Sequence, residues 1–326
     1  MQIFDKKDVT NVLLFTGGLD SVLSYLKLKD KTPNLELVYT PIYIKGSPHY
    51  VNGEVETLKV MANVTTGFLD HPLQFFNSAA RAWDTAWFDK DDPTFIPYRI
   101  PMIIGFVLLT YPNVKNIWIS GMLDDDNPEL HKENIKKLQI ALREFGKNKD
   151  FSIVSPFDWK LFKHEAIHEL LKNVSDDSKK ILEITKAILY SFSSYNYTTI
   201  ADRNKVKNWV NENMQFMNFP YKEIRVAVSS VLNSRNEIPS IDRRPFNTEA
   251  DFELNVALYN GLGLTLPFFD RHLMESMKLK ALDSKNNMSP KKRKAILDYI
   301  AAYDELLYRR DIKSELEVAK FKKSTK

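Results

Sequence analysis

Cysteine is absent from the 326 residues of the chain. Without thiols the protein can form no disulfide, no zinc–thiolate site and no thiol nucleophile. This single absence removes disulfide-stabilised scaffolds and cysteine-dependent enzymes from the function classes to be considered.

Long apolar and long basic runs are also missing. The longest apolar run, Ile100 to Tyr111, is too short to span a bilayer, and the N-terminus lacks a signal pattern, so we expect a cytoplasmic protein without a membrane partner. The formal net charge is +4 and basic residues gather only in the tail, Lys320 to Lys326, which gives little support to extensive nucleic-acid binding. Contents of 44% hydrophobic and 27% charged residues are typical of a soluble globular protein.

A phosphate-binding turn is the strongest local pattern. An apolar run, Val12 to Phe15, opens directly into a polar turn, and a helical pattern, Val22 to Leu28, follows it. Glycines let the backbone take positive φ and approach an anion closely, the helix that follows directs N–H groups at the turn, and hydroxyls at both ends add donors. An ordinary tight strand-to-helix connection is the alternative. The turn consists of Thr16, Gly17, Gly18, Leu19, Asp20 and Ser21.

The order of the patterns predicts an α/β fold with a doubly wound parallel sheet and a helical C-terminal extension. Apolar, β-branched stretches alternate with helical ones, which is typical of such sheets, and their ligands bind beyond the carboxyl ends of the strands. We expect an α/β domain that contains this turn over 1–200 and a mainly helical region over 201–326. Further strands are predicted at Leu35–Tyr43, Val64–Leu69, Val114–Ser120 and Phe151–Ser155, with a helix and a loop over 72–95. The last predicted helices include Glu249–Tyr259 and Pro290–Tyr308.

The turn resembles the Ser-Gly-Gly-x-Asp-Ser loop of the PP-loop ATP pyrophosphatases, with Thr16 in place of the first serine. That family has an adenine nucleotide alpha hydrolase-like, Rossmann-like fold. Its enzymes adenylate a carboxylate or carbonyl oxygen and release pyrophosphate. The resemblance therefore implies ATP and Mg²⁺ as cofactors, with Asp20 helping to place the metal ion.

Four further segments resemble one PP-loop subfamily, the 7-cyano-7-deazaguanine synthases. His49 with Glu54 keeps part of a Tyr-Gly-Gln-Arg-His segment and the helix after it, and its alternative is a polar surface loop. Arg99 stands where an arginine at a helix start faces the substrate, although Ile100 replaces an asparagine there. An arginine that caps a neighbouring carboxylate is the alternative.

The other two segments follow later strands. The run Asp124-Asp125-Asp126 ends the predicted fourth strand, where the subfamily has an aspartate-bearing loop, so Asp124 and Asp126 are candidates for substrate or Mg²⁺ binding against a plain solvated loop. Lys163 matches a lysine that reaches the phosphates, against a solvent-facing helix lysine. With Asp20 and Arg99, it completes the predicted catalytic set.

The resemblance ends where the subfamily binds zinc. Ser194 falls where the first cysteine would be, and the stretch Thr198 to Lys207 offers no cysteine ligand. Lysine and asparagine side chains cannot replace thiolates on zinc, so we expect no zinc site.

Over about residues 10 to 210 the resemblance implies an ATP-dependent ligase. It would convert 7-carboxy-7-deazaguanine to the 7-cyano compound with ammonia, a step of queuosine biosynthesis. Its partners would be ATP and a small-molecule substrate, with a homodimer possible. The alternative is a non-catalytic or repurposed nucleotide-binding or structural descendant of the family.

Overall fold

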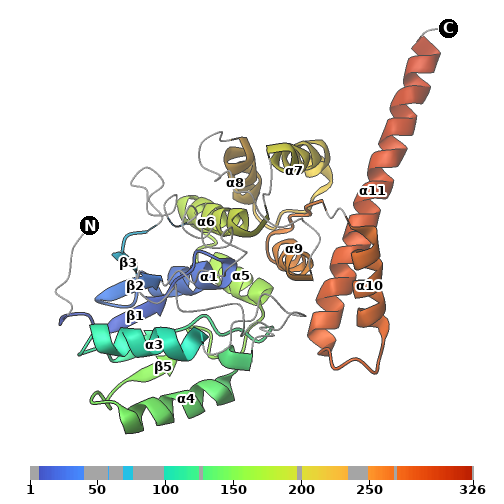
Figure 1. Cartoon of the computed structure of the whole chain (residues 1–326). Coiled ribbons are helices and arrows are strands. Elements are labelled where there is room, and N and C mark those ends of the chain that lie inside the picture. The colour runs from blue at the N-terminus through green and yellow to red at the C-terminus, as the bar shows by residue number, and fades with distance from the viewer. Residues whose placement is uncertain are drawn as a thin grey trace.

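A five-stranded parallel sheet forms the centre of the computed structural model, which describes residues 7–39, 58, 69–75, 99–124, 128–196, 200–233, 249–267 and 270–324 (Figure 1). The strands are β1 (Asn11–Leu14), β2 (Leu35–Tyr39), β3 (Leu73–Phe75), β4 (Asn116–Trp118) and β5 (Ser152–Val154). Their spatial order is β3-β2-β1-β4-β5, and each neighbouring pair is parallel. The predicted α/β class with a parallel sheet is confirmed, and the order is compatible with a Rossmann-like fold.

Both faces of the sheet are covered, because its strands carry apolar side chains on both sides. In β1, Val12 and Leu13 are fully buried but belong to different apolar cores. One core joins the sheet to three helices, α1, α5 and α6, and the other joins it to α3 and α4. A strand buried on both faces is typical of parallel sheets. The helices are α1 (Leu19–Leu28), α3 (Arg99–Thr110), α4 (Lys132–Phe145), α5 (Lys163–Lys172) and α6 (Ser178–Asn196).

The described elements that follow are helical and share the core of α1, α5 and α6 (Figure 1). Helix α9 packs directly on α5, and the approach is close because a side chain on Gly261 would come within 2.8 Å of Ile167. The domain boundary at residue 200 stays a prediction, but one apolar core extends across it. These helices are α7 (Ile200–Asn213), α8 (Lys222–Asn233), α9 (Glu249–Leu262), α10 (Arg271–Leu282) and α11 (Pro290–Ser324).

Two predicted elements differ from the structure. Strand β3 lies at Leu73–Phe75, where we expected a helix and a loop, and it forms by pairing with β2 rather than from a pattern of its own. Residues 64–68 of the expected third strand lie outside the described residues, and Leu69 is not in a strand. Three residues are too few for a periodic pattern to identify a strand.

Helix α11 continues to Ser324, beyond its expected end at Tyr308. Residues 309–324 are rich in Lys, Arg and Glu, which favour helix, and Arg309 pairs with Glu305 one turn earlier. No helix in the described ranges is both long enough and apolar enough to cross a membrane.

A buried hydrogen bond ties the end of α3 to the sheet. The Tyr111 hydroxyl, on a fully buried ring, donates to the Glu36 carboxylate of β2 at 2.9 Å, and Glu36 is only 3% exposed. Burial raises the pKa of Tyr111 well above its ordinary value, and the neighbouring Glu36 carboxylate raises it further. Tyr111 therefore remains a donor throughout the physiological pH range.

Removing this donor should destabilise the fold. We expect Tyr111→Phe to lower the free energy of unfolding by about 1–3 kcal/mol, because a buried carboxylate loses a hydrogen bond. Urea denaturation measures the change. Tyr308→Phe is the matched control, since that side chain is exposed, and equal stability of the two variants would contradict the assignment.

Candidate functional site

The predicted phosphate turn has a left-handed glycine shortly before the start of a helix. Gly17 takes a φ of +78°, in the left-handed region that favours glycine, and α1 begins two residues later. The Gly18 N–H donates to the Thr16 hydroxyl at 3.3 Å, and the Ser21 hydroxyl donates to the Gly18 carbonyl at 2.9 Å. The two hydroxyls are 3.4 Å apart, so they close the turn on itself.

The turn occupies the topological switch point of the sheet. Strand β1 pairs with β2 on one side and with β4 on the other. The strand order therefore reverses at β1, and the chain continues to opposite sides of it. Ligands of open parallel sheets bind in the crevice outside the carboxyl ends of the strands at this point. Residues 16–21 therefore lie where this architecture places a ligand.

Lys163 joins the turn to the loop that follows β4. Its Nζ lies 3.5 Å from Oδ2 of Asp20 and 3.9 Å from Oδ1 of Asp124. The three side chains are 18%, 31% and 16% exposed, respectively. The Lys163 ammonium thus lies between two partly buried carboxylates. Any two of these three residues are at least 39 positions apart in the chain, and they meet because each follows a strand that ends at the same edge of the sheet.

Helix α5, which begins with Lys163, is capped by carboxylates. The preceding residue, Phe162, has no side-chain acceptor, but both oxygens of Asp124 accept from the Lys163 N–H, at 3.2 and 3.4 Å. Glu165 accepts from the Phe162 N–H at 3.1 Å and pairs with Lys291 of α11 at 2.7 Å. These carboxylates satisfy donors that a helix N-terminus otherwise leaves without intrahelical partners.

Titratable groups in the first turn of α5 respond to this arrangement. Partial burial acts to raise the pKa of Glu165, but hydrogen bonds from Lys291 and from the Phe162 N–H outweigh it and lower that pKa. Burial lowers the pKa of His164, although the Glu165 and Asp124 carboxylates act in the opposite direction. Neutral histidine and ionised glutamate are the favoured forms near pH 7.

Hydrogen bonds join the loops that follow β4 and β5. The Ser155 hydroxyl donates to the Gly121 carbonyl at 2.7 Å, and the Leu123 N–H donates to the Leu161 carbonyl at 2.9 Å. These bonds hold the two loops side by side just before Asp124 and Lys163. The relative position of that carboxylate and that helix is therefore set by backbone as well as by side chains.

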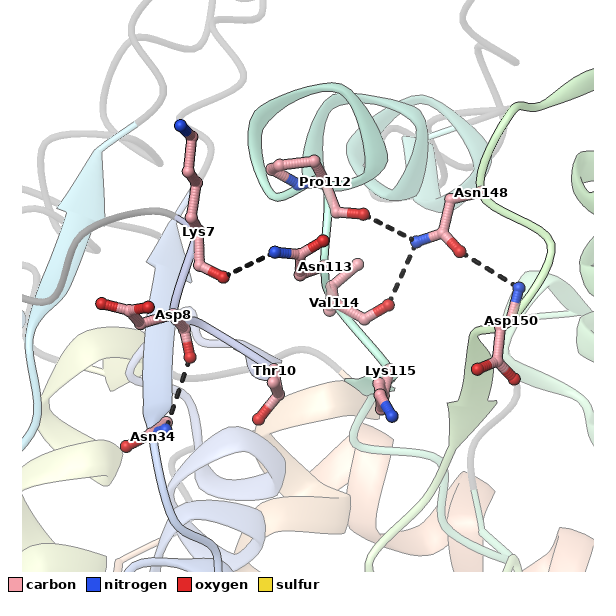
Figure 2. Close-up of a pocket in the computed structure, with 10 residues that line it drawn as sticks. All are labelled: Lys7, Asp8, Thr10, Asn34, Pro112, Asn113, Val114, Lys115, Asn148 and Asp150. Carbon is pink, nitrogen blue, oxygen red and sulfur yellow. Dashed lines mark hydrogen bonds between the residues drawn. The ribbon is translucent and has the colours of Figure 1, made fainter.

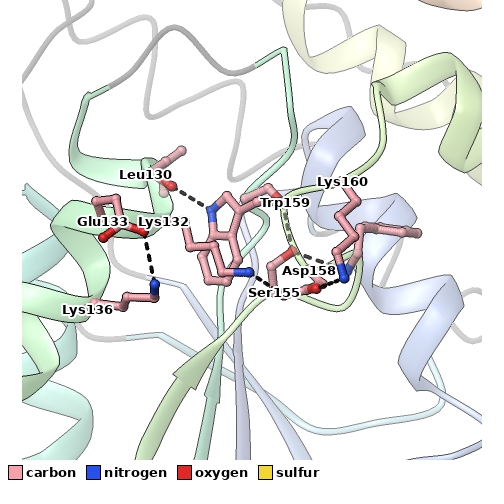
Figure 3. Close-up of polar contacts among 10 residues, drawn as sticks. Leu130, Lys132, Glu133, Lys136, Ser155, Asp158, Trp159 and Lys160 are labelled. Atoms are coloured by element: carbon pink, nitrogen blue, oxygen red, sulfur yellow. Dashed lines mark hydrogen bonds and ion pairs between the residues drawn. The ribbon is translucent and has the colours of Figure 1, made fainter.

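Trp159 fixes the β5 loop against the start of α4 (Figure 3). Its indole N–H donates to the Leu130 carbonyl at 2.7 Å, and the Lys132 ammonium lies 5.6 Å from the ring centroid. Asp158 and Trp159 both have left-handed φ angles, +51° and +54°. Such angles are unusual outside glycine and persist only where surrounding contacts hold them.

Asp158 supplies part of that restraint. Lys132 lies 2.7 Å from its carboxylate and Lys160 also pairs with it (Figure 3). Hydrogen bonds from Lys132 and Lys160 lower the pKa of Asp158 to about 2. The ion pairs that hold the strained turn are therefore present at neutral pH.

Of the remaining predicted residues, only Arg99 lies in the part of the chain that the structure describes. Arg99 is the first residue of α3, whose next N–H, that of Ile100, donates to Glu129 at 3.2 Å. Helix α3 covers the face of the sheet opposite to α1 and α5. His49 and Asp126 lie outside the described residues.

Sequence reasoning missed the roles of Gly121 and Trp159. Gly121 lies in the loop three residues after the end of β4. A Cβ atom there would lie 2.6 Å from Cε2 and 2.8 Å from Cδ1 of the Trp159 indole. A glycine just after an apolar strand signals a close approach, but the sequence does not identify the tryptophan that approaches. The partner, 38 residues later, is brought there by the pairing of β4 with β5.

A cavity of about 670 Å³ lies at the other edge of the sheet (Figure 2). Its lining comes from segments that precede β1, β2, β4 and β5, so it faces the amino ends of the strands. Its asparagines bond to backbone there: Asn113 donates to the Lys7 carbonyl at 2.9 Å and Asn148 to the Val114 carbonyl at 3.1 Å. These contacts link loops, and they explain the asparagines without a ligand.

The chain has no detectable relative in two comparisons with known proteins. No model of a protein family matches it, and no curated protein matches it. Within the described residues no three His, Asp or Glu side chains are grouped as a metal site would require.

Gly121 should not tolerate a side chain. We expect Gly121→Ala to lower the free energy of unfolding by about 1–3 kcal/mol, because the new methyl group overlaps the indole of Trp159. Thermal or urea unfolding measures the change. Gly105→Ala in α3 is the matched control: no atom lies within 4 Å of its new methyl group, and we expect stabilisation of about 0.5–1 kcal/mol. Equal effects of the two substitutions would refute the packing argument.

Proposed function

We propose that the protein binds ATP at the turn 16–21 and adenylates a carboxylate with release of pyrophosphate. One observation carries the proposal: Lys163 Nζ lies 3.5 Å from Asp20, within a glycine turn at the switch point of a parallel sheet. Residues 16–21 and the start of α5 each resemble a separate segment of PP-loop enzymes, and the two segments meet at this contact. A chance match at either segment would not require them to be adjacent.

The proposed chemistry needs charge stabilisation more than a protein nucleophile. A carboxylate oxygen of the acceptor attacks the α-phosphorus of ATP, and the bond from that phosphorus to the leaving pyrophosphate breaks. Backbone N–H groups of the turn and the Lys163 ammonium would stabilise the charge that builds on pyrophosphate. No cysteine is required, in agreement with the composition of the chain.

Mg²⁺ accompanies the nucleotide in this proposal. Magnesium is usually held by one or two carboxylates together with substrate phosphates and water, so a dedicated set of three protein ligands is not needed. The oxygen chemistry of Asp20, which lies inside the turn, fits this role. Arg99 starts a helix on the face of the sheet opposite to α1 and α5, and its catalytic role stays a prediction.

The acceptor that we propose is a 7-carboxy-7-deazaguanine. Displacement of AMP by ammonia would give the amide. A second ATP would then adenylate the amide oxygen with release of pyrophosphate, and loss of AMP and a proton would give the nitrile. The assignment rests on the resemblance of the segments around His49, Arg99, Asp124 and Lys163 to 7-cyano-7-deazaguanine synthases.

Neutralising Lys163 tests the proposed site. We expect Lys163→Met to weaken Mg-ATP binding at least about tenfold, because a charge-assisted contact contributes roughly 1.5–3 kcal/mol. Isothermal titration calorimetry measures the affinity. Lys172→Met, at the exposed end of the same helix, is the matched control and should bind as the wild type does. Unchanged binding by Lys163→Met would contradict the site.

The turn itself gives a second test. Gly17→Ala should abolish Mg-ATP binding, because alanine is disfavoured at a φ of +78°, whereas Thr16→Ser should retain it, because the hydroxyl remains. Calorimetry measures both, with a thermal unfolding curve to show that each variant is folded. A folded Gly17→Ala protein with normal affinity would count against the loop assignment.

A pyrophosphate-release assay with 7-carboxy-7-deazaguanine and ammonia separates catalysis from binding. Substrate-dependent release supports the ligase. Binding of Mg-ATP without such release supports a nucleotide-binding descendant of the family, and absence of binding removes both proposals.

A further inference from the structure

Asp124 has a carboxylate that is already engaged by the protein. Both of its oxygens accept from the Lys163 N–H, and Oδ1 lies 3.9 Å from the Lys163 ammonium. The side chain is only 16% exposed. A magnesium ion bound to this carboxylate would lie close to the ammonium and would compete with a helix N-terminus for the same oxygens.

The position of Lys163 depends on this contact. Phe162 cannot cap α5 with its own side chain, so the first turn is held by Asp124 from the β4 loop and by Glu165 from within the helix. Asp124 is the side-chain contact that ties the helix start to the β4 loop, next to the backbone bond from the Leu123 N–H to the Leu161 carbonyl. The Nζ that extends from this backbone position lies 3.5 Å from Asp20 in the turn.

We propose that Asp124 is a positioning residue: it holds the backbone of Lys163 so that the ammonium is directed at the turn 16–21. This inference rests on the proposed function, because the ligand that Lys163 meets there is Mg-ATP. It replaces the expectation that Asp124 itself binds substrate or Mg²⁺. The role needs an acceptor oxygen at this position but does not need a negative charge.

Two substitutions separate positioning from metal binding. Asp124→Asn keeps an acceptor for the Lys163 N–H and removes the charge, whereas Asp124→Ala removes both. We expect Asp124→Asn to bind Mg-ATP within about threefold of the wild type and Asp124→Ala to bind about tenfold more weakly. Equal losses in the two variants, or wild-type affinity of Asp124→Ala, would overturn the proposal.

Asp177→Ala is the matched control for a general loss of helix capping. Asp177 accepts from the Lys179 and Lys180 N–H groups, both at 3.1 Å, at the start of α6. Its substitution should lower the melting temperature but leave the affinity for Mg-ATP unchanged. If Asp177→Ala weakens binding as much as Asp124→Ala does, the effect is one of stability and the proposal is wrong.

Hydrogen exchange gives a readout that does not depend on the nucleotide. In the full-length protein without ligand, the amides of the first turn of α5 should exchange faster in Asp124→Ala than in the wild type, and Asp124→Asn should restore their protection. If the wild type fails to bind Mg-ATP, the proposed function fails while this comparison still decides whether Asp124 fixes the helix. Unchanged exchange in Asp124→Ala would refute the positioning role.

Discussion

The parallel pairing of β1 with both β2 and β4 is the constraint on which the rest of the structure depends. Parallel strands end at a common edge, so the segments that follow β1, β4 and β5 meet although they are far apart in the chain. The turn 16–21, Asp124 and Lys163 are such segments. Their proximity follows from the topology before any side-chain contact is considered.

Helix α5 connects this edge to the C-terminal region. Its first turn contacts Asp20 and Asp124, while its body packs on α9, where Gly261 allows close approach to Ile167. Lys291 of α11 also pairs with Glu165 in the first turn. The C-terminal helices are therefore part of the support of the candidate site, and their core continues that of α1, α5 and α6.

The start of α5 brings a backbone N–H group and a charged side chain of the same residue, Lys163, to the candidate site. The Lys163 N–H and the Phe162 N–H before it are bonded to carboxylates, and the Lys163 side chain adds an ammonium at the same helix start. The strained turn at Asp158 and Trp159 holds the preceding loop against α4. An exposed lysine could adopt many conformations, but Lys163 is 18% exposed and begins a helix whose start is restrained from two sides.

Local features of the chain could be predicted from sequence because local chemistry determines them. The apolar run before Thr16, the glycines of the turn and the helical pattern after it predicted the first strand, turn and helix, and Gly17 takes the positive φ that only glycine adopts readily. The helical periodicity of the C-terminal region likewise predicted α9 to within a few residues and the start of α11.

Tertiary structure decided the features that depend on a distant partner. Strand β3 exists because β2 offers an edge, and three residues carry no pattern that would predict it. The acidic run 124–126 predicts a metal or substrate ligand, and only the fold shows that the Asp124 carboxylate accepts from the N–H of Lys163. Gly121 is required by a tryptophan 38 residues away. Sequence specified which groups were available, and the pairing of the strands determined which of them met.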